Sequence, residues 1–209
     1  MKGRALLAAS LVVASSPALS AEPRVWSFRV YLDDAPIGHH SFTLRETAST
    51  RELTSEARFT VKVLGINAYR YAHNATEHWR GDCLNGLTAR TDDNGEPTNV
   101  NASRAGERLT VSGNRTPEAL SGCVMTFAYW NPAILRESRL LNAQTGEYEA
   151  VRVALVGEEK ISVKGAAVTA TRYRVTGSKH PIDLWYSPDN EWLQLESTIS
   201  GGRRLRYRL

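Results

Sequence analysis

Apolar and polar side chains alternate along most of this chain with a period of two residues. In one run, Phe59, Val61 and Val63 alternate with Thr60 and Lys62. Successive side chains of a β-strand point to opposite faces, so this pattern gives a sheet one apolar face and one polar face. The sequence therefore predicts an all-β, mainly antiparallel fold.

The alternation recurs in about a dozen runs, and turn residues separate them. Pro36 and Gly38 favour a turn between the first two runs, which predicts a β-hairpin, and we expect Gly157 to end another strand. Pro132 suits the first turn of one short helix over residues 133–137. So many short strands indicate a barrel or a sandwich. The predicted strands cover residues 26–32, 39–45, 53–63, 68–79, 84–90, 109–111, 148–156, 161–163, 168–176, 182–186, 192–197 and 204–209.

The N-terminal residues have the pattern of a secretory signal peptide. Lys2 and Arg4 precede an apolar run over residues 5–14, and small residues follow up to Ala21. The run is too short to cross a membrane, which takes about 20 apolar residues. We expect cleavage after Ser20 or Ala21, a single β-rich domain over residues 22–209 without a transmembrane segment, and a secreted, periplasmic location.

The charge balance gives no sign of a polyanionic partner. The formal net charge is +4, and Lys2 and Arg4 fall in the predicted signal peptide. Nucleic-acid binding requires clustered cations rather than a mild excess. We therefore expect no nucleic-acid partner.

Cys83 and Cys123 are the two cysteines of the sequence. In an oxidising compartment such a pair is most simply a disulfide. Two buried free thiols, or a metal or redox pair, are the alternatives. We predict the disulfide, because there is no Cys-x-x-Cys spacing and a zinc site takes four ligands.

The histidines and acids form no recognisable catalytic or metal-binding pattern. His39 and His40 point to opposite faces of one strand, as do His73 and His78 of another. We therefore expect isolated structural or surface histidines, no metal, no cofactor and no catalytic residue.

Large aromatic residues are the remaining candidates for a site. Core packing explains many of them, because large rings dominate β cores. If the sheet curls without filling its interior, however, the rings would line a ligand cavity. The candidate ligand-binding residues are Tyr69, Tyr71, Trp79, Tyr129, Trp130, Trp185 and Trp192.

Six segments of the exported part carry a resemblance: residues 32–38 (LDDAPIG), 77–84 (EHWRGDCL), 129–132 (YWNP), 141–147 (LNAQTGE), 183–186 (DLWY) and 204–207 (RLRY). On these segments the exported part resembles an uncharacterised family of bacterial periplasmic β-rich proteins. That family is similar in architecture to the unclosed β-barrels of lipoprotein carriers, so the resemblance implies an open β-barrel, with a β-sandwich as the alternative. It also implies a non-enzymatic protein that binds or carries an apolar or lipid-like ligand. The second hypothesis is a structural or assembly accessory of the cell envelope that acts by contact with an envelope protein.

Overall fold

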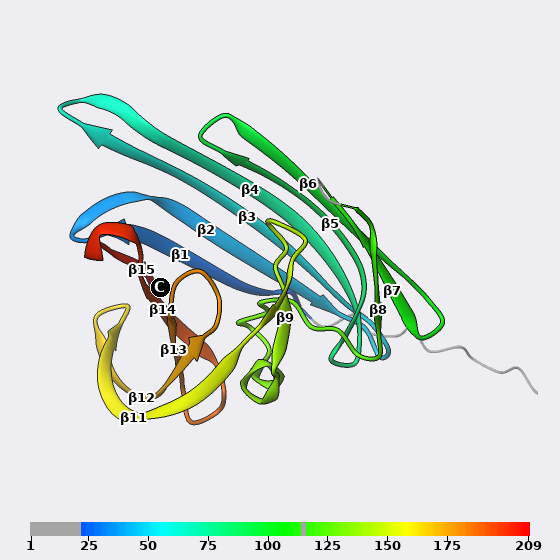
Figure 1. Ribbon diagram of the computed structural model, residues 1–209. Coiled ribbons are helices and arrows are strands. Elements are labelled where there is room, and N and C mark those ends of the chain that lie inside the picture. The colour runs from blue at the N-terminus through cyan, green and yellow to red at the C-terminus, as the bar shows by residue number, and fades with distance from the viewer. Residues whose placement is uncertain (1–21, 114–115) are drawn as a thin grey trace, which may run out of the picture.

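One antiparallel sheet of 13 strands dominates the computed structural model, which describes residues 22–113 and 116–209 (Figure 1). The order across the sheet is β11-β12-β13-β14-β15-β1-β2-β3-β4-β5-β6-β7-β8. The strands β8 and β11 are its two edges, so the curved sheet is not closed into a barrel. The predicted signal peptide, residues 1–21, lies outside the described residues. The sheet strands are β1 (Arg24–Leu32), β2 (Ala35–Glu46), β3 (Arg51–Val63), β4 (Ile66–Arg80), β5 (Cys83–Asp93), β6 (Glu96–Ala105), β7 (Arg108–Ser112), β8 (Glu118–Ser121), β11 (Arg152–Val163), β12 (Ala166–Thr176), β13 (Ile182–Tyr186), β14 (Trp192–Thr198) and β15 (Arg204–Arg208).

The sheet consists of two runs of consecutive antiparallel strands, and pairing between the first and last strands joins them. The strands β1–β8 form one run and β11–β15 the other. In the junction, Val30 of β1 pairs with Tyr207 of β15, and Leu32 pairs with Leu205. The open, antiparallel all-β fold expected from the alternating pattern is confirmed.

The segment between the two runs lies against the concave side of the sheet (Figure 1). It contains a short 3-10 helix, η1 (Pro132–Arg136), and a two-stranded sheet of β9 (Arg139–Leu141) and β10 (Tyr148–Ala150). The Asn131 side chain caps η1 by accepting a hydrogen bond from Ala133 N, and a second 3-10 turn, η2 (Ser200–Gly202), precedes β15. The helix predicted to begin at Pro132 is present. The segment is anchored because several of its apolar side chains, among them Ile134, Leu140 and Leu141, are fully buried.

Several details of the predicted strand pattern were wrong. The short strands β8 and β9 were not predicted. Strand β6 was missed because Val100 is its one buried large aliphatic residue. Gly157 does not end a strand, since β11 continues through it with a register shift between Leu155 and Gly157. The predicted strand 148–156 is divided at Val151 between β10 and β11.

Cys83 and Cys123 form the predicted disulfide, with their Cα atoms 4.9 Å apart. The bond joins the first residue of β5 to the segment that follows β8. Next to it, Leu84 N donates a 2.8 Å hydrogen bond to Val124 O. The covalent link therefore fixes the start of the segment that covers the concave side.

We expect that replacing both cysteines by serine lowers the free energy of unfolding by about 2–4 kcal/mol, since the disulfide closes a long loop and restricts the unfolded chain. Urea denaturation followed by tryptophan fluorescence measures the change. Reduction of the unmodified protein should produce the same loss. Equal stability of the oxidised protein and the double variant would contradict the prediction.

Candidate functional site

Small side chains on the inner face of the sheet leave room for a cavity. Across the four neighbouring strands β2 to β5, Phe42 pairs with Ser55, Ser55 with Ala75, and Ala75 with Ala89. Two residues further along β3, Ala57 pairs with a larger residue on each side, His40 of β2 and His73 of β4. Leucines or phenylalanines at these positions would fill the curved interior, but serine and alanine do not.

A cavity of about 390 Å³ lies between this face and the segment that follows β8. This volume falls within the range of small-molecule sites. Its walls combine apolar residues with polar ones. The apolar lining includes Phe42, Leu53, Phe127, Tyr129, Trp130, Ile182 and Leu195; the polar lining includes His40, Ser55, His73, Glu77, Thr126, Ser178 and Lys179.

Two histidines meet on the inner face of the sheet. The ring centroids of His40 and His73 are 6.5 Å apart, because both residues pair with Ala57, whose methyl group does not separate them. His40 Nε2 is 2.9 Å from Ser55 Oγ, and His73 Nδ1 is 2.9 Å from Thr91 Oγ1. The expectation of isolated histidines was therefore wrong. The period-two pattern placed each ring on a face but did not show which strands are neighbours.

Burial keeps both imidazoles neutral. It lowers the pKa of His40 to about 3, with smaller contributions from His73 and His39, and lowers the pKa of His73 to about 4. The contact between Ser55 and His40 is a poor nucleophile–base pair, because so weak a base draws few protons from a hydroxyl. Ser55 also lies in the middle of a strand that pairs on both sides, where backbone N–H groups are held in the ladder rather than free to stabilise an oxyanion.

Glu77 is a buried carboxyl group in the cavity wall, with 5% of its surface exposed. Trp79 Nε1 donates a 3.1 Å hydrogen bond to its Oε2. Burial raises the pKa of Glu77 to about 7, and the hydroxyl of Thr126 and the Trp79 N–H partly oppose this rise. The carboxyl is therefore largely protonated below about pH 7, and it can donate a hydrogen bond.

One further polar atom in the cavity wall, Trp130 Nε1, is buried without a hydrogen-bond partner in the described part of the chain. Nearly all buried polar groups in proteins have a partner, which can be a water or a ligand. A bound molecule that accepts a hydrogen bond from this N–H would therefore satisfy it.

The structure places the seven predicted aromatic residues differently. Tyr129 and Trp130 line the cavity, and Trp79 packs edge-to-face on Trp130 with centroids 5.6 Å apart. Trp192 packs on Tyr129 and Phe28. Tyr71 stacks on Phe59 near the end of the sheet, and Tyr69 lies two residues before Tyr71 on the same strand. Trp185 lies on the face of the sheet opposite the cavity, with Ala170 and Leu193. A ligand-binding role for any of them stays a prediction.

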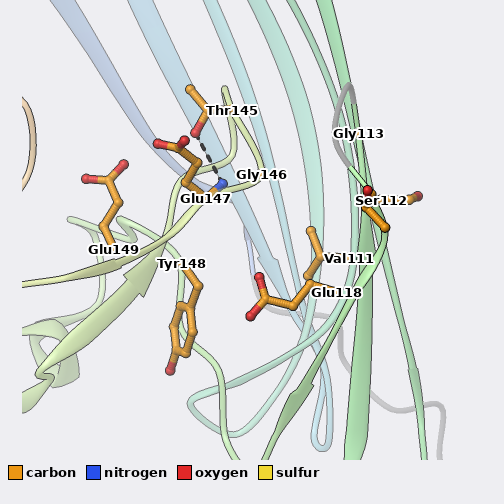
Figure 2. Close-up of a pocket in the computed structure, with 10 residues that line it drawn as sticks. Val111, Ser112, Gly113, Glu118, Thr145, Gly146, Glu147, Tyr148 and Glu149 are labelled. Carbon is orange, nitrogen blue, oxygen red and sulfur yellow. Dashed lines mark hydrogen bonds between the residues drawn. The ribbon is translucent and has the colours of Figure 1, made fainter.

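A second hollow, of about 750 Å³, lies between the hairpin of β7 and β8 and residues 145–149 (Figure 2). Its lining is mainly polar and includes Glu118, Glu147 and Glu149. Glu149 accepts a 2.8 Å hydrogen bond from Asn142 Nδ2, and Glu147 N donates to Thr145 Oγ1 at 3.2 Å. Tyr148 is its one aromatic residue. The concave cavity, with its larger apolar wall, is the better candidate for a ligand site.

Two kinds of site find no support in residues 22–113 and 116–209. No three His, Cys, Asp or Glu side chains there are grouped as ligands of one metal ion. Among the same residues, no helix has the length and apolar character needed to cross a bilayer.

We expect Glu77→Gln to raise the free energy of unfolding by about 3 kcal/mol at pH 8 and to have little effect near pH 4. Burial raises the pKa of Glu77 in the folded protein to about 7, from an ordinary value of 4.5. The folded protein therefore binds more protons than the unfolded chain between these values, and ionisation of Glu77 destabilises it as the pH rises. Urea denaturation across this pH range measures the effect.

The exposed acid Glu96 of β6 provides the matched control for this measurement. Glu96→Gln should change stability little at either pH. A Glu77→Gln effect that is the same at both pH values would contradict the predicted pKa.

Comparisons with known proteins establish the family and the fold. A search of curated proteins found no match. A solved structure described as a beta-barrel-like protein of domain of unknown function DUF1849 from Brucella abortus is similar, with a TM-score of 0.65 and 8% sequence identity over 90% of this chain and 95% of that chain. At so low an identity, the similarity shows the fold alone. The model of a family described as domain of unknown function DUF6134 matches residues 28–209, and the chain therefore belongs to the DUF6134 family.

Proposed function

We propose that this protein is a non-enzymatic binding protein that holds an apolar or lipid-like small molecule in the cavity on the concave face. The observation that carries the proposal is the cavity of about 390 Å³, with apolar residues and buried polar atoms in one wall. Sites for small molecules combine an apolar lining with a few polar groups that fix orientation. The disulfide supports a location outside the cytoplasm, in the periplasm, because such bonds persist in oxidising compartments.

The polar groups favour a ligand with an uncharged hydrogen-bonding group. His40 and His73 are neutral because burial lowers their pKa values, and Glu77 is protonated below about pH 7. Nδ1 of His73 contacts Thr91, which leaves Nε2 for a ligand. A hydroxyl or carbonyl group on an apolar body matches these partners.

A second candidate function is an accessory of the cell envelope that acts by contact with another protein. It is favoured by the sheet edge at β11, a strand of 12 residues. A long edge strand presents unpaired backbone groups to which a partner strand can add.

We expect Ala75→Leu to weaken uptake of N-phenylnaphthylamine by about tenfold or more, because the added side chain occupies the cavity floor. Ala75 is 7% exposed and lines the cavity. Fluorescence titration measures the affinity of the probe, and urea denaturation confirms that the variant is folded.

The matched control is Ala72→Leu on the same strand, three residues away, where the side chain points to the opposite face. This variant should bind the probe as the unmodified protein does. The proposal fails if the unmodified protein takes up no probe and also yields no lipid on solvent extraction after purification from its own host.

A further inference from the structure

The hairpin of β3 and β4 extends beyond both of its neighbours in the sheet (Figure 1). The ladder with β2 ends where Gly38 pairs with Phe59, and the ladder with β5 ends where Tyr71 pairs with Asp93. Beyond these rungs, β3 and β4 pair with each other as far as Val63 and Ile66. At ~3.3 Å per residue, the tip lies roughly 15 Å beyond these last rungs.

The tip of this overhang, around Leu64 and Ile66, carries exposed apolar side chains. Leu64 is 97% exposed and Ile66 is 72% exposed. In monomeric soluble proteins exposed apolar residues occur singly without special meaning, but two at one projecting tip indicate an interaction site.

The backbone of the tip gives no reason for an apolar residue. Leu64 and Gly65 have φ values of 51° and 82°, so both are left-handed, as in the two-residue turns that join antiparallel strands. The corresponding turns elsewhere place Asn94 before Gly95 and Lys164 before Gly165. Asparagine tolerates this region better than leucine does. Neither burial nor turn geometry therefore explains why an apolar residue occupies position 64.

Charge at the tip favours an anionic surface. Residues 60–70 include Lys62 and Arg70 and no acid, and both cations are exposed. At the turn between β1 and β2, Asp33 and Asp34 are paired with Arg203 and Arg206. Lys62, which pairs with Asn67, is the cation nearer the tip. Arg70 lies further back, where Asn94 N donates a hydrogen bond to its carbonyl oxygen, at the level of the acids Asp92, Asp93 and Glu96.

We propose that this hairpin tip docks the protein on the surface of an anionic lipid bilayer, with Leu64 and Ile66 inserted at the headgroup boundary. A protein partner fits the tip less well, because two side chains on a narrow projection cover far less than the ~800 Å² per partner of a stable interface. Insertion of a few apolar side chains with help from cations is how peripheral proteins hold to lipid. Asp93, at the base of the overhang, also lines the cavity, so docking turns this end of the cavity toward the bilayer.

The test is sedimentation of the full chain, as recovered from its host, with vesicles of phosphatidylethanolamine and phosphatidylglycerol. The double substitution Leu64→Asn and Ile66→Thr should weaken partitioning by about tenfold or more, since it removes the inserted apolar surface. Asparagine suits the left-handed turn and threonine suits a strand, so the fold is preserved. Lys62→Gln should weaken partitioning on these vesicles and have no effect on vesicles of phosphatidylcholine.

The matched control is Leu155→Thr on β11, because Leu155 is 66% exposed and lies on a different hairpin. It should partition like the unmodified protein. The proposal is overturned if the unmodified protein does not sediment with the vesicles, or if the double variant sediments equally well. A protein partner would be favoured instead if the unmodified protein does not sediment with the vesicles and if an envelope protein that is recovered with the unmodified protein is lost from the double variant. The tip variants should bind N-phenylnaphthylamine normally, so failure of docking and failure of the cavity proposal are separate results.

Discussion

The pairing of the first strand with the last is the contact on which the rest of the architecture depends. The strands β1–β8 and β11–β15 each follow the chain from neighbour to neighbour, and only the ladder of β1 and β15 joins the two runs into one sheet. Asp33 reinforces this junction: its N–H donates to Arg204 O at 2.7 Å, and its carboxylate accepts from Arg204 N and from Arg203 Nε, each at 2.9 Å. Hydrogen bonds to Arg204 and Arg203 lower the pKa of this carboxyl. Because the two strands are at opposite ends of the sequence, the junction can form only after most of the chain is in place.

The cavity follows from this junction and from the size of the residues on the inner face. Once the two runs are joined, the sheet curves, and side chains on its concave side converge. Phe28, Phe42 and Trp192 fill one part of the interior, with centroids 4.4 to 6.2 Å apart. Ser55 and Ala75 leave the neighbouring part open. The segment 122–150 then packs over the opening and is fixed there by the disulfide.

The sequence predicted the class of fold, the disulfide and the short helix, because each depends on local pattern or on residue type. Period-two alternation identifies a strand wherever large apolar residues mark one face, as in β3, and fails where they are scarce, as in β6 with its single Val100. It also cannot separate a bulge from a turn, which is why Gly157 was misassigned.

The candidate site was harder to predict. Trp185 is on the other face of the sheet from Trp192 because a register shift separates Trp185 and Tyr186, and the meeting of His40 with His73 depends on the small residue Ala57 between them. A signal was present in the unusual run of small residues on the apolar face of β3, Ser55 and Ala57.

The buried titratable groups of the cavity act on stability in opposite directions, and this has a consequence for the ligand. Below about pH 6.5, the lowered pKa values of His40 and His73 make the folded state bind fewer protons than the unfolded chain, so these residues lower stability as the pH falls. Glu77 has a raised pKa, so over the range from about 7 down to 4.5 it increases stability as the pH falls. Within that range all three groups are predominantly uncharged: the imidazoles have lost their protons and the carboxyl has kept its own. The buried titratable groups in the cavity wall are therefore neutral, whereas the charged residues of the lining, Asp93, Glu149 and Lys179, are exposed or only partly buried. An uncharged hydroxyl or carbonyl group suits the buried wall, because it can form hydrogen bonds with these neutral groups and requires no counterion there, so the pKa values favour a ligand whose buried part is uncharged.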